Sequence, residues 1–293
     1  MSTPTYGGQA VIEGVMMRGA TAMAIAVRRP DGSIAGRSER LHGVFTGPLR
    51  LVPLLRGVLV LFETLTLGMR ALTWSAAVAS DQVDERGEAH RLTVIDWFVL
   101  LGAFAVGMGV FFVGPVLATA WLDRLLPARW MPLLIEGVLR VALLLGYIWA
   151  MGRSGDIRRV FQYHGAEHMT IYAHEDGREL NVPAIRRYPK EHPRCGTSFL
   201  LTVALVSMVV FAFAGSDPLW WRLSSRLILI PVVAGASYEA IRFAGFHQRW
   251  PVVRWLFAGN MALQKLTTRA PDDEQIQVAI AALQRVRDQE RVA

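Results

Sequence analysis

Long runs of apolar residues occupy much of the middle of this 293-residue chain. The clearest run covers residues 97–122, contains no charged residue, and lies between Asp96 and Asp123. A helix needs roughly 20 apolar residues to cross the hydrocarbon core of a bilayer. Helices in the cores of soluble proteins rarely extend that far without a charge. The run therefore predicts a membrane-spanning helix.

Three further segments are long and apolar enough for the same prediction, and they cover residues 131–151, 197–214 and 227–244. The first contains Glu136 and Arg140 at i,i+4 spacing, so the two charges share one helix face and can neutralise each other. The last contains Glu239 and Arg242, which favours a polar bundle interior or a membrane edge. The pattern predicts about four transmembrane helices.

Two other segments mix apolar and charged positions in the manner of helices that lie in the membrane interface. Residues 49–74 carry a charge about once in every two helical turns. Residues 250–266 combine Arg254 and Lys265 with Trp255. We therefore expect interfacial or re-entrant helices beside the spanning ones.

The charge distribution predicts the orientation of these helices. Lysine and arginine exceed aspartate and glutamate by 31 to 24, which gives a net charge of +7. Residues 152–196 and the chain after the fourth span are rich in basic residues, whereas the opposite connectors hold only Arg124 and Arg129, and Arg222 and Arg226. Because short cytoplasmic loops carry the excess of basic residues, we expect both termini in the cytoplasm. Orientation and anionic lipid account for the positive charge, so no nucleic-acid partner is expected.

The more polar remainder predicts a small α+β domain. Residues 22–29 and 33–41 resemble strands, and between them lies Pro30-Asp31-Gly32, a sequence typical of a turn. Near the C-terminus an amphipathic helix is expected to dock on this domain, because one face is apolar. Its apolar stripe consists of Ile276, Ile280, Leu283 and Val286.

The expected fold is an α-helical integral membrane protein with a small α+β cytoplasmic domain. That domain would be built from the N-terminal segment, the middle loop and the C-terminal helix. The expected order is a β-rich segment (1–47), an interfacial or re-entrant helix (48–80), a charged linker (81–96), transmembrane helices one and two (97–151), a cytoplasmic loop (152–196), transmembrane helices three and four (197–246), and an interfacial segment with the C-terminal helix (247–293).

The middle loop holds the most informative motif. Apolar residues at 157, 160, 161, 171 and 172 follow a helical period that continues through His164, Glu167 and His168. His-x-x-Glu-His is the inverted zincin pattern. The two histidines, one turn apart, can share a tetrahedral metal, and the glutamate can act as general base toward water. The alternative is a pair of hydrogen-bonded structural histidines, with Glu167 as base, ligand or ion-pair partner.

A second group precedes the third apolar run. His192 and Cys195 lie on either side of a proline turn that can aim both side chains at one point. Either could be a third ligand, and the cysteine could be a nucleophile. Glu239 is the carboxylate alternative, unless it forms an ion pair with Arg242 or Arg140. The expected cofactor is zinc or another divalent transition metal.

Four motifs together resemble the YqhQ-like family, a bacterial family of unknown function with the label of a predicted metal-dependent enzyme. They cover residues 7–18, 163–168, 192–196 and 238–239. The resemblance extends from residue 7 to about residue 283. It implies a multi-pass protein of the bacterial inner (cytoplasmic) membrane.

Three functions follow as hypotheses. The first is a zinc-dependent hydrolase that acts on a peptide or lipid-like substrate at the cytoplasmic face. The second is a non-enzymatic membrane scaffold or assembly factor with a structural His/Glu/Cys site. The third is an oligomeric transporter or channel, in which the intramembrane charges line a pathway. The expected partners are the lipid bilayer and other copies or other membrane proteins. The single cysteine excludes a disulfide scaffold, and 53% hydrophobic residues exclude a disordered chain.

Overall fold

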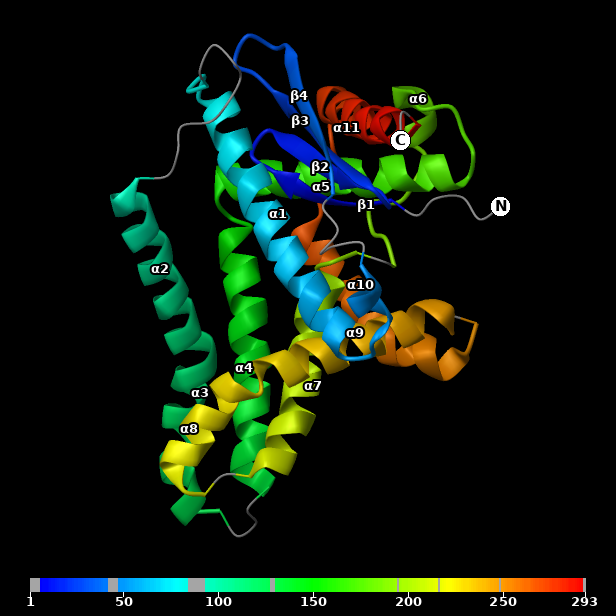
Figure 1. Ribbon diagram of the computed structural model, residues 1–293. Coiled ribbons are helices and arrows are strands. Elements are labelled where there is room, and N and C mark those ends of the chain that lie inside the picture. The colour runs from blue at the N-terminus through cyan, green and yellow to red at the C-terminus, as the bar shows by residue number, and fades with distance from the viewer. Residues whose placement is uncertain are drawn as a thin grey trace.

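The structure is a computed structural model that describes residues 6–41, 47–83, 93–126, 130–193, 195–215, 217–247 and 249–291. A small β-sheet covered by helices lies at one end of the molecule, and the long helices α2, α4 and α7 extend away from it (Figure 1). Outside the described residues lie most of the expected charged linker (84–92), Arg194, and the side chains of Arg124 and Arg129.

The N-terminal segment forms an antiparallel sheet in which each strand pairs with the next. Its strands are β1 (Gly7–Val11), β2 (Gly14–Arg18), β3 (Ala22–Arg28) and β4 (Ile34–Arg40). The strands predicted on either side of Pro30-Asp31-Gly32 are confirmed. Gly32 adopts φ +84°, which a residue without a Cβ reaches at little cost.

Helices cover both faces of the sheet. Helix α5 (Gly155–Glu175) and helix α11 (Asp273–Arg291) pack on one face, and α1 (Leu55–Ala79) packs on the other. Successive side chains of a strand point to opposite faces. Met17 therefore enters the core beneath α5 and α11, while Met16 enters the core beneath α1.

The predicted C-terminal helix docks on this sheet. Three residues of its apolar stripe, Ile276, Leu283 and Val286, are fully buried in the core. Because the helix can bury this stripe only against another apolar surface, the sheet and α11 stabilise each other across nearly the full length of the chain.

Two helical segments are long and apolar enough to cross a membrane. One covers Val94–Ala120 and the other is α4 (Trp130–Met151). The first consists of α2 (Val94–Met108), the π-helical turn η2 (Gly109–Val113) and α3 (Gly114–Ala120). Phe98 and Phe104 of α2 are 72% and 68% exposed. Such an apolar exposed surface suits lipid better than water, so the structure is consistent with a membrane protein.

The prediction of about four spanning helices is supported in part: among the described residues two helices are long and apolar enough, or three if a bent pair counts as one span. Helix α7 (Ser198–Ala214) has 17 residues, which is at the lower limit for a crossing. Helices α8 (Leu219–Ile228) and α9 (Ile230–Phe246) are long and apolar enough to cross a membrane only when taken together, and they meet at a 52° bend. Pro231 lies in the first turn of α9, where its ring prevents a continuous helix.

The arginines expected in the connector between the third and fourth spans are also placed differently. Arg222 and Arg226 lie within α8 and are buried against Glu136 of α4. The expected pair of Glu136 with Arg140 forms as well, at 3.0 Å. A hydropathy pattern counts an arginine as polar, whereas the folded helix buries it because a carboxylate lies opposite.

The remaining elements are short turns and one further long helix. They are η1 (Pro48–Leu51), η3 (Trp121–Arg124), α6 (Val182–Ile185) and α10 (Pro251–Thr267). Helix α1 buries one side against the sheet and exposes Phe62 and Leu65 on the other. Helix α10 exposes Trp255 in the same way. That these two helices lie in the membrane interface stays a prediction.

Gly14 tests the packing of the sheet. A Cβ at this position would lie 2.3 Å from the carbonyl oxygen of Ala26 on the paired strand. We expect Gly14→Ala to lower the free energy of unfolding by about 1–3 kcal/mol, seen as a lower Tm in detergent. Gly7→Ala is the control, because a Cβ there meets nothing within 4 Å. Equal Tm values for the two variants would contradict this packing.

Candidate metal site

Helix α5 carries the first residues of the candidate site. His164, Glu167 and His168 are all buried, on the face of α5 that the 3.6-residue period predicts. The helix begins after Ser154, and Asp156 lies in its first turn, where a carboxylate is favourable next to the positive end of the helix dipole. Three titratable groups therefore lie in the protein interior and need partners there.

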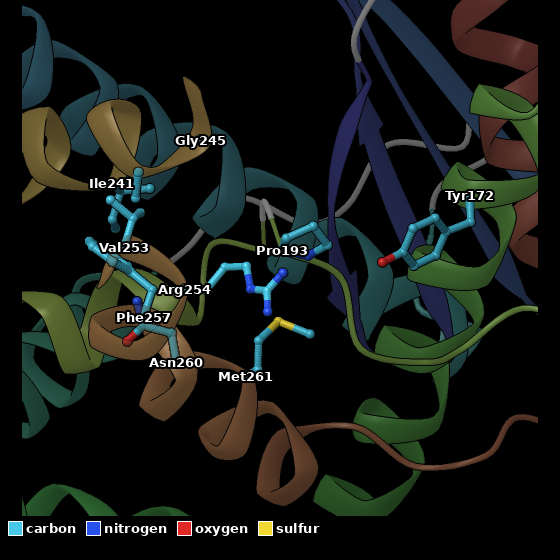
Figure 2. A pocket seen from close by; sticks show the side chains of 10 residues that line it. Tyr172, Pro193, Ile241, Gly245, Val253, Arg254, Phe257, Asn260 and Met261 are labelled. Carbon is cyan, nitrogen blue, oxygen red and sulfur yellow. The ribbon is translucent and has the colours of Figure 1, made fainter. Parts of the chain in front are cut away.

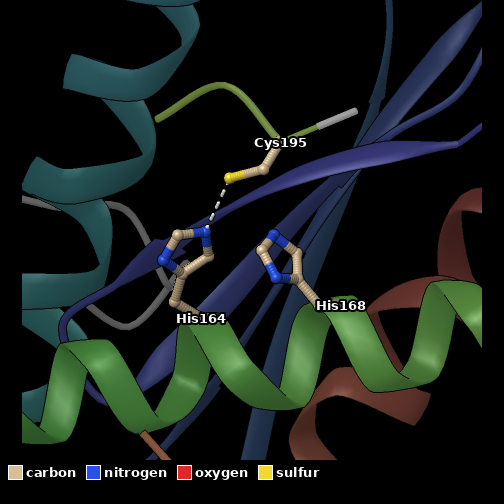
Figure 3. A group of neighbouring side chains, drawn as sticks. All are labelled: His164, His168 and Cys195. Carbon is tan, nitrogen blue, oxygen red and sulfur yellow. Dashed lines mark hydrogen bonds between the residues drawn. The ribbon is translucent and has the colours of Figure 1, made fainter. Parts of the chain in front are cut away.

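Cys195 joins the two histidines (Figure 3). The candidate ligand atoms of His164, His168 and Cys195 all lie within 4.8 Å of one another, and all three residues are buried. The His164 Nε2 lies 3.1 Å from the Cys195 Sγ, and the two imidazole rings have their centroids 4.4 Å apart. Cys195 comes from the segment just before α7, so the group joins two separate parts of the chain.

Backbone carbonyls orient both imidazoles. The Nδ1 atom of His164 lies 2.9 Å from the carbonyl oxygen of Thr267, and that of His168 lies 2.6 Å from the carbonyl oxygen of Lys190. Because a carbonyl only accepts, this network assigns the proton of each neutral ring to Nδ1. Both Nε2 atoms then present a lone pair toward Cys195. Metal-binding histidines are held in this way in other proteins.

The hydrogen bonds among these three side chains leave one atom unsatisfied. The single thiol proton can satisfy the His164 Nε2, whereas the Nε2 of His168 is buried without a hydrogen-bond partner among the described residues. A shared cation would satisfy both rings and the sulfur together. Tetrahedral zinc holds N and S ligands about 3.5 Å apart, so the 3.1 Å separation needs to open by only a few tenths of an ångström.

Burial keeps the neighbouring histidines neutral. Burial is the main cause that lowers the pKa of His168 to about 2, and the nearby His164 adds to the effect. Burial alone lowers the pKa of His192 to about 4. Neutral imidazole is the form that binds a metal, so neither ring must lose a proton at physiological pH before it could do so.

Glu167 lies beside this group against strand β1. Burial is the main cause that raises the pKa of its carboxyl group to about 8. Cys195 raises this pKa further, whereas His164 and the hydrogen bond from the Gly8 backbone N–H lower it. A Cβ on Gly8 would lie 2.9 Å from the carboxyl carbon of Glu167. Glycine at this position therefore allows the strand to approach the carboxyl group, whose pKa suits the gain and loss of a proton near neutrality.

His192 lies next to the three-residue group. Its ring centroid is 5.7 Å from that of His168 and 4.4 Å from that of Tyr172, and its Nε2 lies 3.6 Å from a carboxylate oxygen of Glu175. Its backbone N–H donates to the Gln264 side chain at 2.7 Å, and the Gln264 amide donates back to its carbonyl at 2.9 Å. Gln264 of α10 thus holds the segment that carries Cys195. Nothing in the sequence pattern singled out this glutamine.

Glu239 lies apart from the three-residue group. Its carboxylate accepts hydrogen bonds from the Arg56 side chain at 2.7 Å and from the Leu54 backbone N–H at 3.1 Å, at the start of α1. The ion-pair alternative for this residue named Arg242 or Arg140 as partner, whereas the structure places Arg56 there. The pairing joins α1 to α9.

The glycine-rich opening segment holds two helices onto the sheet. Glu13, at φ 51° in the β1–β2 turn, accepts hydrogen bonds from Arg159 of α5 at 2.5 Å and from the Tyr163 hydroxyl at 3.2 Å. Arg18 at the end of β2 pairs with Glu63 of α1 at 2.6 Å. The conspicuous residues of this segment therefore position α5, on which both histidines lie.

A pocket of about 280 Å³ lies near the candidate site, and Figure 2 shows its lining residues. Tyr172 and Pro193 line it on the side of the metal site, and residues of α9 and α10, including Arg254 and Met261, form the remaining walls. Because Tyr172 packs against His192, the pocket shares a wall with the surroundings of the candidate site.

Fold and site together define a helical protein with two candidate membrane spans and a buried group that could hold a metal. The chain belongs to the family described as "Protein of unknown function (DUF1385)", whose model matches residues 52–289. It is 34% identical over 287 residues to "Uncharacterized protein YqhQ" of Bacillus subtilis (strain 168), over 94% of this chain and 90% of that protein. No solved structure matches it. The resemblance to the YqhQ-like family is confirmed.

Gln264 tests how the segment before α7 is held. We expect Gln264→Leu to lower the free energy of unfolding by about 1–3 kcal/mol, because the backbone groups of His192 lose buried partners. Cys195 should also react faster with a thiol reagent. Gln277→Leu, at an exposed position of α11, is the matched control. Unchanged Tm and thiol reactivity in Gln264→Leu would show that the segment is held by other contacts.

Proposed function

We propose that this protein binds a divalent transition metal, zinc before others, through the His164 Nε2, the His168 Nε2 and the Cys195 Sγ. The observation that carries the proposal is the buried Nε2 of His168, which has no hydrogen-bond partner in the part of the chain that the structure describes and lies beside an imidazole and a thiol. Imidazole nitrogen and thiolate sulfur are the donors that zinc prefers. The carbonyl partners of both Nδ1 atoms support it, because they direct the other nitrogen of each ring to the same point.

Three protein ligands leave a fourth tetrahedral position, as in catalytic zinc sites, and this favours hydrolysis as the reaction. A metal at this site would supply Lewis acidity toward a water or a substrate carbonyl group. Glu167 would accept a proton and return it to the leaving group, since its pKa of about 8 permits both steps near neutral pH. The carbonyl oxygens of Thr267 and Lys190 would keep the two imidazoles in place throughout.

The substrate we propose is a peptide or a lipid-like molecule at the membrane surface. The pocket beside His192 supports this class, because apolar residues such as Val253 and Phe257 contribute to its walls. The basic residues of the middle loop and the C-terminal segment favour the cytoplasmic face of the bacterial inner membrane. The lipid bilayer is then the first partner of the protein, beside other copies or other membrane proteins.

A structural site is the second candidate, and the position of His192 favours it. With its ring centroid 5.7 Å from that of His168, His192 is close enough to become a fourth ligand after a modest shift. Closed sites of four Cys and His ligands are structural. Such a site would join α5 to the segment before α7, as a membrane scaffold or assembly factor would need.

Measurement of bound metal tests both the hydrolytic and the structural form of the proposed site. We expect the purified wild-type protein to contain roughly one zinc per chain, and His168→Ala and Cys195→Ser to lose most of it, because each removes a ligand. His247→Ala is the control, since the His247 ring is bonded to the Phe243 carbonyl oxygen in a different part of the protein. A folded wild-type protein that binds no zinc or other transition metal would exclude both versions.

Glu167→Gln separates hydrolysis from a structural role. We expect this variant to retain its metal and to lose about 10²- to 10⁴-fold in hydrolytic rate, seen first as failure to complement a strain that lacks the gene. His192→Ala is the companion variant. Retained metal in His192→Ala favours the open site, whereas loss of metal from it, together with full complementation by Glu167→Gln, supports the structural site.

A further inference from the structure

A second group of buried charges lies in the helical bundle, outside the metal site. Its members are Glu136 and Arg140 of α4, and Arg222 and Arg226 of α8, and each is at most 5% exposed. The carboxylate of Glu136 accepts hydrogen bonds from all three arginines at 3.0–3.1 Å. One negative charge is therefore divided among three guanidinium groups.

This group holds more positive than negative charge even when Arg222 is not counted, because Arg140 and Arg226 both pair with the one carboxylate of Glu136. Among the described residues, the other partners of Arg140 are the Phe111 carbonyl oxygen, the Ser207 hydroxyl and the Phe112 and Phe211 rings. Those of Arg226 are the Gly215 carbonyl oxygen, the Ser225 hydroxyl and the Phe211 ring. Among the described residues, these two guanidinium groups thus share one carboxylate, and at least one positive charge is met only by neutral dipoles and aromatic rings. A buried charge in this state is strongly unfavourable without a further anion.

Arg140 borders a cavity of about 420 Å³ between α2, α4 and α7. Its lining comes from α2, η2, α4 and α7, and α2 diverges from α4 toward the end of the molecule that holds the sheet (Figure 1). Arg140 and the Ser207 hydroxyl provide charge and polarity in an otherwise mostly apolar lining. A volume of about 300–1,000 Å³ is typical of small-molecule sites, so this cavity has room for a ligand next to the surplus charge.

The lining of the cavity includes apolar residues that are exposed on the helix surface. Phe104, Tyr147 and Leu200 line it and are exposed on the outer surface of the helices. Phe104 and Tyr147 belong to the two segments that are long enough to cross a membrane. The π-helical turn η2 lies at the same cavity and directs the Phe111 carbonyl oxygen to Arg140. Such turns occur frequently at functional sites.

We propose that this cavity binds an anionic lipid, with its acidic group against Arg140 and Ser207 and its acyl chain along the apolar walls. The acidic group supplies the negative charge that Arg140 and Arg226 lack, and the acyl chain fills a space that would open to hydrocarbon. An inorganic anion is a poor occupant, because it would exchange its hydration for one guanidinium group, one hydroxyl and apolar walls. The proposal is independent of the metal site.

Palmitate and hexadecanol are matched probes, since they share a chain length and differ in charge. With protein purified in a non-ionic detergent, we expect palmitate to raise the Tm and to bind about tenfold or more tightly than hexadecanol, because a buried charge-assisted hydrogen bond forms. Equal affinities would overturn the proposal, since the cavity would then be only apolar. An equal rise in Tm with inorganic phosphate would overturn it in favour of a small anion.

Two variants locate the binding. Ala204→Phe fills the cavity from α7 and should abolish palmitate binding, whereas Leu205→Phe, at a 47% exposed neighbouring position outside the lining, should not. Arg140→Gln should remove the preference for palmitate over hexadecanol and leave hexadecanol affinity unchanged. If Arg140→Gln does not fold, the Ala204→Phe comparison decides alone. Palmitate binding that survives Ala204→Phe would overturn the proposed location, and zinc content in the same samples reports separately on the metal site.

Discussion

Helix α5 buries two imidazoles and a carboxyl group between the sheet and the helical bundle, and the surrounding structure supplies what that burial requires. Polar groups in the interior are costly unless they are hydrogen-bonded. The Thr267 and Lys190 carbonyl oxygens, the Gly8 backbone N–H and the Cys195 thiol provide these bonds, and they come from three separate segments. The opening strands, the segment before α7 and the end of α10 therefore meet where α5 needs partners.

The molecule has two buried polar centres, and their electrostatics differ in sign. At the metal site burial keeps the His168 and His192 rings neutral, and lone pairs converge on one point. That arrangement favours a cation. In the bundle, guanidinium groups outnumber the carboxylate of Glu136 beside a mostly apolar cavity. That arrangement favours an anion with an apolar chain. Two functional proposals thus follow from one rule about uncompensated buried groups.

Periodicity predicted the elements more reliably than it predicted their relation to the membrane. The strands around Pro30-Asp31-Gly32, the buried face of α5 and the docked stripe of α11 all agree with the structure. The third and fourth predicted spans correspond to helices, but α7 has only 17 residues and α9 is long enough to cross only together with α8, across a 52° bend. The hydropathy pattern also placed Arg222 and Arg226 in a connector, because it does not include their tertiary contact with the carboxylate of Glu136.

The sequence by itself determined the features that depend on neighbours a few residues away. Turn chemistry, helical period and the one-turn spacing of His164 and His168 are of this kind. The tertiary structure alone decided that Cys195 reaches His164, that Glu239 pairs with Arg56, and that Gln264 holds the backbone of His192. These contacts join residues far apart in the chain. They form only when helix packing and backbone hydrogen bonding bring the segments together, which local patterns do not encode.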